Sequence, residues 1–287
     1  MESGVPMARF SLQGLSLDRL RSFLEVADAG GHAAAAPGNP GRQSQLSRQL
    51  GELETALGQV LFVRRGRRLE ITPAGTALAR VVRELDQGLH DVAAAERGPA
   101  RVRLGAGDSV LQWLVLPRLP KLLPALEGVE LELGALDSDG VAAALQDGRI
   151  DLGLLRASEA TPELKAARLG RVSYAVFSAV GRGKLPLAAP TSERGLGAAL
   201  ASMGPLGLRC ETFPQVAQAV RSGAFAGVLP TFARGQFPAA EFRAQALPAL
   251  DAVGTPLLLA WRPRTVELRP QVKRLALALR ACGDGLR

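Results

Sequence analysis

Cysteine and histidine are nearly absent from this chain of 287 residues, which holds two of each. With only Cys210 and Cys282, a small scaffold stapled by disulfides is excluded, and the scarcity of cysteine fits a reducing compartment. Long apolar runs are missing as well, since no uncharged stretch approaches the roughly 20 residues that span a bilayer. The first residues, MESGVPMARFSLQGLSL, lack the basic start and apolar core of a secretory signal. We therefore expect a cytoplasmic protein with no membrane partner.

Patterns of catalytic and metal-binding residues are also lacking. The sequence contains no paired carboxylates, no Ser-His-Asp arrangement and no phosphate-binding Walker motif. Cys210 has neither a histidine nor a second cysteine near it in sequence, so metal or thiolate chemistry has little support. We expect that the protein is not an enzyme and that it uses no metal and no cofactor.

Positive charge is in excess, but not where a nucleic-acid interface would need it. The formal net charge is +8. Residues 1–100 contain 12 arginines, no lysine and 11 acidic residues, whereas the rest of the chain contains 23 basic and 16 acidic residues. Because a basic surplus favours nucleic acids only where it is concentrated, the net charge alone does not decide the function.

Apolar spacing predicts two helices on either side of a sharp turn near the start of the chain. Ser16 suits the N-cap of the first, while Asn39 and Pro40 suit the N-cap and first position of the second. GGHAAAA, between them, reads as a short helix ended by Pro37. The second long helix ends at Gly58, and all its faces but one carry long hydrogen-bonding side chains. The remaining face is an apolar stripe of Leu46, Leu50, Leu53 and Leu57.

A hairpin and a long helix are expected next, in VLFVRRGRRLEITPAG and beyond. Residues 60–63 and 69–72 are strand-like, and residues 64–68 form the tip, where Gly66 allows the bend. Residues 73–97 predict a helix with a narrow apolar seam typical of a coiled-coil partner. The seam is Leu78, Val81, Val82, Leu85, Leu89 and Val92.

After the Gly-Pro pair at residues 98–99 the pattern changes to alternating strands and helices. RVRLGAG, VELELGAL and IDLGLL read as strands, separated by the helices SVLQWLVLPRLPKLL and VAAALQDG. This β-α-β-α-β order predicts a parallel sheet with right-handed crossovers. A second set contains YAVFSAV, PLGLRC, VAQAVRSG and AGVLP, followed by a strand PLLLAWR and a closing helix. The Gly/Pro-rich residues 181–197 are expected at the surface. The fold class is α/β, with more than one domain.

Helix, sharp turn, polar helix and arginine-tipped hairpin together form the arrangement of a winged helix-turn-helix. The second helix is sized for the major groove, where Gln, Arg and Ser side chains hydrogen-bond to base edges. The hairpin tip reaches phosphates or the minor groove. The alternative for the helix alone is an ordinary solvated surface, and the four arginines beside it favour DNA.

The same segments resemble the amino-terminal domain of LysR-type transcriptional regulators. The resemblance lies in LRSFLEVADAGG, in SQLSRQLGELETALGQVLFVRRGRRLEITPAG and in the helix that follows. It implies binding to double-stranded DNA, with Ser47 on a phosphate. Two departures stand out: His32 replaces an aromatic residue of the family, and residues 39–42 replace a Leu-Gly-Val-Ser turn. The implied DNA-binding residues are Gln43, Ser44, Gln45, Ser47, Arg48, Arg64, Arg65, Arg67 and Arg68.

The second half resembles the effector domain of the same family more loosely, in LPRLPKLLPALEGVELEL, LQDGRIDLGLL, AVRSGAFAGVLP and LLLAWRP. This implies two α/β subdomains, of the type 2 periplasmic-binding-protein kind, around a cleft for a small-molecule effector. Ser109 stands where the family often has a Ser or Thr lining that pocket. Asp108 is equally consistent with an N-cap, and as a carboxylate at the mouth it would repel an anionic effector. The effector-site candidates are Asp108, Ser109, Asp137, Ser138, Arg209 and Thr212.

The resemblance also implies a division of the chain and a set of partners. We expect a DNA-binding domain at residues 1–75, a dimerising linker helix at 73–98 and an effector domain at 100–287. Its subdomains would cover about 100–174 with 254–287, and 175–253. A homo-oligomer, dimer or tetramer, is implied, with RNA polymerase as a candidate partner. Two other classes stay open, a solute-binding protein and a cytoplasmic enzyme or small-molecule-binding protein that uses the cleft. Binding to DNA separates the regulator from both.

Overall fold

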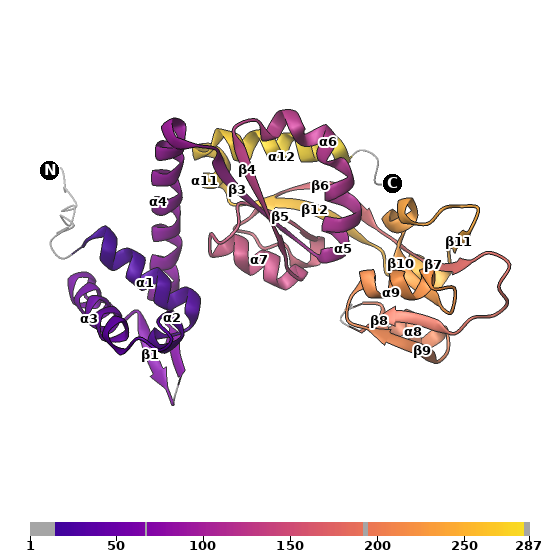
Figure 1. The fold of residues 1–287 in the computed structure, drawn as a ribbon, viewed down its shortest axis with the longest axis horizontal. Coiled ribbons are helices and arrows are strands. Elements are labelled where there is room, and N and C mark those ends of the chain that lie inside the picture. Colours follow the sequence, from indigo (N-terminus) through magenta and orange to yellow (C-terminus); the bar gives the residue numbers. More distant parts are fainter. Residues whose placement is uncertain (1–14, 67, 192–194, 284–287) are drawn as a thin grey trace, which may run out of the picture. The chain divides into compact units, whose positions relative to one another are not determined.

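The chain forms two compact units, Met1–His90 and Asp91–Arg287. The computed structural model describes residues 15–66, 68–191 and 195–283, and Figure 1 shows the order of the elements along the chain. Within these ranges, none of the helices combines the length and the hydropathy that a membrane crossing requires.

The first unit begins with two expected helices: α1 (Leu17–Ala29), which the apolar spacing predicts, and α2 (His32–Ala35), which lies in the segment GGHAAAA. Ser16 caps α1 by accepting a hydrogen bond from the backbone N–H of Arg19 at 3.2 Å. Gly30 ends it in the left-handed region at φ 73°, which a glycine adopts without strain. The N-cap predicted at Ser16 is therefore confirmed, and α2 ends shortly before Pro37 as expected.

Helix α3 (Pro40–Leu57) follows the turn and packs on α1 through its leucine stripe. The side chain of Asn39 caps it by accepting from the N–H of Arg42 at 3.0 Å, and Gly58 ends it at φ 62°. Both assignments agree with the prediction. The core of the unit consists of Phe23, Val26, Ala36, Leu46, Leu50, Leu53, Leu61, Phe62 and Ala79.

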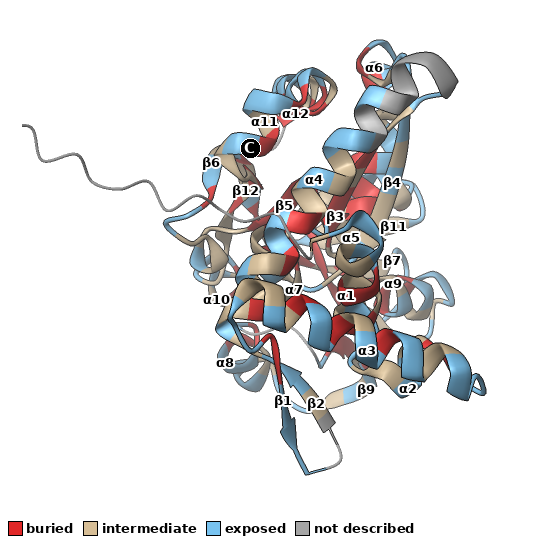
Figure 2. Cartoon of the chain, turned by 90° about the vertical axis from the view of Figure 1, so that its left-hand side faces the viewer, coloured by how far each residue is buried: buried red, intermediate tan, exposed pale blue. Residues whose placement is uncertain are grey.

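The hairpin strands are β1 (Phe62–Arg65) and β2 (Arg68–Ile71), antiparallel, with Phe62 opposite Ile71. The prediction placed the first strand at residues 60–63 and the second at 69–72, so it was wrong by one or two residues. At the start of the first strand, Oε1 of Glu54 accepts from the N–H groups of Leu61 and Phe62, and at the other end the pairing continues to Arg65 opposite Arg68. The hairpin is largely exposed, as its pale blue colour in Figure 2 shows.

Helix α4 (Pro73–Arg97) has the length that the pattern predicts and starts at a tight contact. Thr72 caps it: the Oγ1 atom donates to the carbonyl of Val60 at 2.7 Å and accepts from the N–H of Gly75 at 3.0 Å. A Cβ atom at Gly75 would lie 2.3 Å from the carbonyl oxygen of Leu61, so only glycine fits there. Farther along the helix, Val81, Leu85, Leu89 and Val92 are exposed.

The second unit contains two five-stranded sheets, of which the first has the order β4-β3-β5-β12-β6. Strands β4 and β5 run parallel to β3, as predicted, but β12 is antiparallel to both of its neighbours. The sheet is therefore mixed, because β12, which comes from near the end of the chain, runs in the opposite direction between β5 and β6. Its elements are β3 (Ala100–Ala106), β4 (Val129–Ala135), α7 (Ser138–Gln146), β5 (Leu152–Arg156), β6 (Lys165–Val172), β12 (Thr255–Trp261), α11 (Pro263–Leu268) and α12 (Pro270–Gly283).

The segment after β3 is not the single regular helix that its pattern predicts. It runs through α5 (Asp108–Val110), a π-helical turn at Leu111–Val115, a 3₁₀ turn at Leu116–Arg118, α6 (Leu119–Leu122) and a second 3₁₀ turn at Leu123–Leu126. Three prolines, at positions 117, 120 and 124, remove backbone donors from this stretch, so its hydrogen-bond pattern changes repeatedly.

The second sheet has the order β11-β7-β10-β8-β9. Strand β8 lies inside residues 181–197, which were expected to be a surface stretch. That expectation was wrong: Ala188 and Ala189 are fully buried, and the strand was missed because it is short and built of small residues. The elements are β7 (Tyr174–Ala179), β8 (Leu187–Pro190), α8 (Gly197–Ser202), β9 (Leu206–Cys210), α9 (Phe213–Arg221), β10 (Ala226–Pro230), β11 (Phe242–Gln245) and α10 (Pro248–Asp251), with 3₁₀ turns at Ala157–Glu159 and Thr231–Gln236.

Candidate nucleic-acid interface and ligand cavity

The polar side of α3 is the first candidate interface. Leu46, Leu50 and Leu53 are buried, and because an α-helix has 3.6 residues per turn, positions 44 and 48 fall on the side opposite to them. Four of the DNA-binding candidates on this helix are exposed: Ser44, Gln45, Ser47 and Arg48. The helix therefore presents a continuous polar surface while its leucines hold it to the unit.

Gln43, the fifth candidate on α3, has a different environment. It is half-buried, and its Nε2 donates a hydrogen bond to the carbonyl oxygen of Ala36 at 2.8 Å. Ala36 is itself buried at the end of α2. The amide of Gln43 therefore ties α3 to α2 across the sharp turn, and it does not join the exposed set.

Arg42, which the sequence reasoning left out of the candidates, orders the start of α3. Its guanidinium pairs with Glu25 on α1, and its Nη1 donates to Oε1 of Gln45 at 3.1 Å. This bond uses the carbonyl oxygen of Gln45 and so leaves the amide NH₂ as the group that can donate to a base acceptor.

Arg48 is held only weakly by its own unit. Its side chain is 73% exposed, and its Nε lies 4.0 Å from Oε1 of Glu52. Glu52 is closer to Arg19, at 2.7 Å. An exposed pair at the limit of contact contributes little, so Arg48 can exchange it for a phosphate or a base edge.

The arginines of the hairpin are the second part of the candidate interface. Arg64 and Arg65 are exposed and lie in β1, not at a tip as predicted, because β1 continues to Arg65. Arg65 pairs with Glu70 across the hairpin at 3.2 Å, with its side chain 77% exposed. Arg67 and the side chain of Arg68 lie outside the described residues.

His32 lies under the hairpin in an environment that disfavours its charged form. Burial, and secondarily the positive charge of Arg64, lower the pKa of His32 below 6.5, while Glu54 acts in the opposite direction. Its Nε2 is buried without a hydrogen-bond partner. The imidazole is therefore neutral near pH 7 and packs in the place where the family carries an aromatic ring.

The second unit contains a cavity of about 350 Å³. Five of the six effector candidates line it: Asp108, Ser109, Asp137, Ser138 and Thr212. They come from the turn after β3, the start of α7 and the start of α9, so the topology brings together residues that are up to a hundred positions apart. Arg209 does not line the cavity, because it is an exposed residue of β9.

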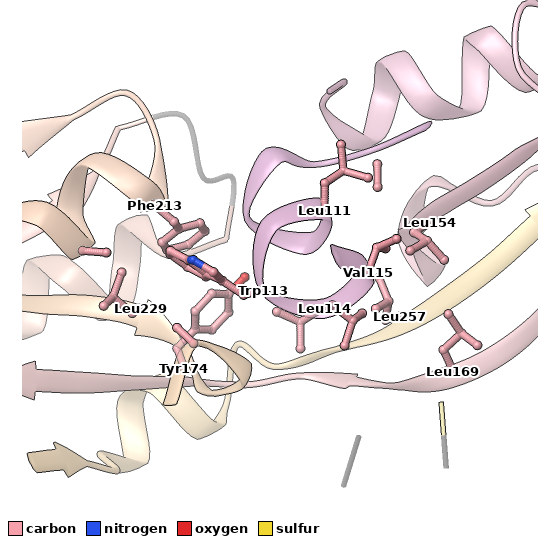
Figure 3. Close-up of a cluster of buried hydrophobic side chains, with 14 of the residues drawn as sticks. Leu111, Trp113, Leu114, Val115, Leu154, Leu169, Tyr174, Phe213, Leu229 and Leu257 are labelled. Atoms are coloured by element: carbon pink, nitrogen blue, oxygen red, sulfur yellow. The ribbon is translucent and has the colours of Figure 1, made fainter. Parts of the chain in front are cut away.

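Arg156 and Tyr174 form a central pair of the cavity wall that the sequence reasoning missed. Nη2 of Arg156 donates to the Tyr174 hydroxyl at 3.2 Å. The ring of Tyr174 stacks on Phe213, with centroids 5.8 Å apart, and both are visible with Trp113 in Figure 3. Burial raises the pKa of Tyr174, although Arg156 opposes the shift, so the phenol stays neutral. No motif could have revealed this pair, because the two residues lie in separate strands, Arg156 at the end of β5 and Tyr174 at the start of β7.

The ends of α7 and α9 at the cavity are capped by the chain itself. Asp137 accepts from the N–H of Gly140 at 2.8 Å. Thr212 and Gln215 form a reciprocal capping box at the start of α9. Within the described residues, no group of three or more His, Cys, Asp or Glu side chains is placed so that it could hold a metal ion.

Comparison with known proteins gives two family models that together match most of the chain. Residues 17–76 match the model described as "Bacterial regulatory helix-turn-helix protein, lysR family", and residues 95–282 match "LysR substrate binding domain". Among curated proteins, a probable nitrogen assimilation transcriptional activator of Synechocystis is 31% identical over 146 residues, 49% of this chain and 47% of that protein. The MetR regulator of Salmonella typhimurium is 30% identical over 141 residues, 48% of this chain and 44% of that protein. The chain thus spans about half the length of these curated relatives.

Solved structures show the fold. ArgP from Mycobacterium tuberculosis has a TM-score of 0.66 at 20% identity, covering 95% of this chain and 98% of that one. LysG from Corynebacterium glutamicum, solved with bound effector Arg, has a TM-score of 0.63 at 21% identity, covering 95% of this chain and 100% of that one. CbnR in complex with its target DNA has a TM-score of 0.59 at 20% identity, covering 93% of this chain and 100% of that one. The chain belongs to the LysR family of helix-turn-helix transcriptional regulators.

Proposed function

We propose that this regulator binds double-stranded DNA with sequence preference through the exposed face of α3, and that a small molecule in the cavity modulates it. The observation that carries the proposal is the division of α3. Its leucines are buried, whereas Ser44, Gln45, Ser47 and Arg48 are exposed. Such a helix can enter the major groove without losing its own packing. The neighbouring structure of CbnR with its target DNA supports this reading.

The hairpin supplies the complementary electrostatic part. Arg64 and Arg65 lie on a largely exposed β1, where they can reach the phosphate backbone beside the groove. Phosphate contacts set affinity and register, whereas the α3 side chains set sequence preference. We assign Arg67 and Arg68 to the same role from their place in the sequence.

The division of the chain follows from these roles. We assign residues 1–75 to DNA binding, 73–98 to a linker helix and 100–287 to effector binding, with subdomains at about 100–174 with 254–287 and at 175–253. Asp108, Ser109, Asp137, Ser138 and Thr212 line the effector cavity, and Arg156 and Tyr174 join them. Arg209 is left outside the site.

The linker helix provides the means of oligomerisation. Leu85 and Leu89 are exposed on α4 at a spacing of four, and Val92, 75% exposed, follows three residues later. A seam of this kind is stabilised when a second copy of the helix covers it. The protein is then a dimer or a tetramer, acting in the cytoplasm as a non-enzymatic regulator, with RNA polymerase as a further partner.

The test is selection of binding sites from random duplex DNA by the full-length protein, followed by titration of the enriched and random sequences. We expect an enriched sequence with a higher affinity than random DNA at the same salt concentration. Arg48→Ala should abolish most of that preference. Gln218→Ala, a matched control at an exposed position of α9, should leave it unchanged. Recovery of no preferred sequence would contradict the proposal.

A further inference from the structure

The ionisable side chains of the cavity have a charge opposite to that of the chain. The protein carries a formal net charge of +8. Among the residues that the structure describes, the lining of the cavity contains, in contrast, one guanidinium, that of Arg156, and five carboxylates. The carboxylates are Asp108, Asp137, Asp139, Glu159 and Glu211. A concave site lined by one sign of charge raises the local concentration of ligands of the opposite sign.

Several of the groups that could bind an anion already have hydrogen-bond partners within the chain. Arg156, the guanidinium of the lining, donates to Tyr174. At α9, the N–H of Gln215 is capped by Thr212, and Pro214 at the second position has no N–H. At α7, Asp137 takes the N–H of Gly140. Helix N-termini attract anions through such donors, and here the chain's own oxygen atoms satisfy several of them.

Two of the carboxylates accept hydrogen bonds from neutral side chains. Asp108 accepts from the amide of Gln112 at 2.9 Å, and Glu159 accepts from the hydroxyl of Ser158 at 2.9 Å. A neutral donor does not compensate the carboxylate charge, so a cationic ligand would gain both a charge-assisted hydrogen bond and charge neutralisation.

The rest of the lining is apolar and aromatic. Leu154, Val172 and Leu257 are buried side chains of the lining, and the rings of Tyr174 and Phe213 stack beside them. Figure 3 shows Leu154 and Leu257 on the side of the first sheet and the two rings on the other. Aromatic faces attract organic cations, and apolar walls bind the carbon chain that carries the charge.

We propose that the effector of this regulator is a small organic cation, an amine or guanidine on a short carbon skeleton, held by the cavity carboxylates with its apolar part against the leucines and aromatic rings. The proposal rests on the proposed role of the cavity as the effector site. It specifies the class of ligand, which the fold alone leaves open, because this class follows from the side chains of this chain.

The test uses the full-length protein and a series of probes matched in size and differing in charge: cadaverine, butylamine, agmatine, butanol and butyrate. Each is titrated at constant ionic strength, and binding is followed by calorimetry and by the shift in Tm, which rises with the concentration of any ligand that binds the folded state. We expect the three cations to bind and to raise Tm, butanol to have a smaller effect, and butyrate none.

Charge-neutralising variants locate the effect. Asp108→Asn and Glu159→Gln keep a side-chain acceptor and remove one charge each, so each should weaken cation binding by about tenfold. Glu267→Gln, at an exposed position of α11 outside the lining, is the matched control and should bind cations like the unaltered protein. Binding of butyrate at least as tight as that of butylamine, absence of binding by all three cations, or equal affinities in the cavity variants and the control would each overturn the proposal.

The same samples are titrated with the selected DNA, which separates this inference from the proposed function. Sequence-specific DNA binding without any cation binding overturns the ligand class alone. Loss of sequence-specific DNA binding in the unaltered protein overturns the proposed function, whatever the cations do.

Discussion

The side-chain amide of Gln43 donates to the carbonyl oxygen of Ala36 at 2.8 Å, a contact that joins the start of α3 to the end of α2. The next glutamine on the helix, Gln45, is exposed. Two glutamines that look equivalent in sequence therefore have separate roles, one in the architecture of the turn and the other in the surface that we assign to DNA.

The different environments of Gln43 and Gln45 predict that replacing the first changes the stability of the protein and replacing the second changes DNA recognition. Gln43→Ala leaves the Ala36 carbonyl without this donor and should lower the stability of the first unit by about 1 kcal/mol. The ratio of the affinities of the Gln43→Ala variant for cognate and random DNA should stay unchanged. Gln45→Ala should leave stability within about 0.5 kcal/mol but cost roughly 1–3 kcal/mol on the cognate site and little on random DNA. Thermal unfolding and fluorescence anisotropy measure the two quantities. The reverse pattern would remove Gln45 from the interface.

The hairpin arginines should act through phosphates. Arg64→Ala and Arg65→Ala are each expected to lower the slope of log K against log salt concentration by about one, with equal losses on cognate and random DNA. Glu70 competes for Arg65 at 3.2 Å, so Glu70→Gln should strengthen binding to random DNA at low salt. An unchanged slope in Arg65→Ala would show that this arginine does not contact DNA.

Gly75 should be intolerant of a side chain. A Cβ there would lie 2.3 Å from the Leu61 carbonyl oxygen and 2.7 Å from Cγ1 of Ile71, so Gly75→Ala must displace either the hairpin or α4. We expect a loss of about 1–3 kcal/mol in stability of the first unit. Gly51→Ala is the control, because a Cβ at that helical position meets nothing within 4 Å. It should stabilise α3 by about 0.5–1 kcal/mol. Equal effects of the two variants would contradict the tight contact.

His32 should make the first unit less stable in weak acid. Burial, and to a lesser extent Arg64, lower its pKa in the folded protein, so the unfolded chain takes up the proton first as the pH falls. Stability is then complete above about pH 6.5 and declines below it, until the pKa of the folded protein is reached. His32→Phe should flatten this part of the pH dependence of Tm.

Histidine signals in NMR provide the direct check. The chain contains only two histidines, so the titration of His32 can be assigned by loss of its signal in His32→Phe. Arg64→Gln should move the pKa of His32 upward, because it removes a positive charge that lowers it. A titration at or above the usual pKa of about 6.5 in the unaltered protein would contradict the assignment.

The helices of the first unit could be predicted because their signals are local. Ser16, Asn39 and Gly58 act on backbone groups within a few residues, so their types and spacing are enough to place the helix ends. The start of the first hairpin strand was misplaced because the carboxylate of Glu54, several residues earlier, takes the donors of Leu61 and Phe62. That contact depends on how α3 lies against the hairpin.

In the second unit, short-range patterns again predict the strands of β3, β4 and β5, but not the partners of β12 or the buried strand β8. Pairing of β12 with β5 joins residues about a hundred positions apart, and such pairing depends on the closed topology, not on local propensity.

The sequence by itself therefore determines the elements whose causes lie within one or two turns of chain: the capped helices, the leucine stripe of α3, the long α4 and the alternating order of strands and helices. The tertiary structure decides which polar side chains are available. It turns Gln43 inward and leaves Gln45 outside, excludes Arg209 from the cavity and adds Arg156 and Tyr174 to it. The physical reason is that exposure and charge environment depend on segments distant in sequence, which meet only when the chain is folded.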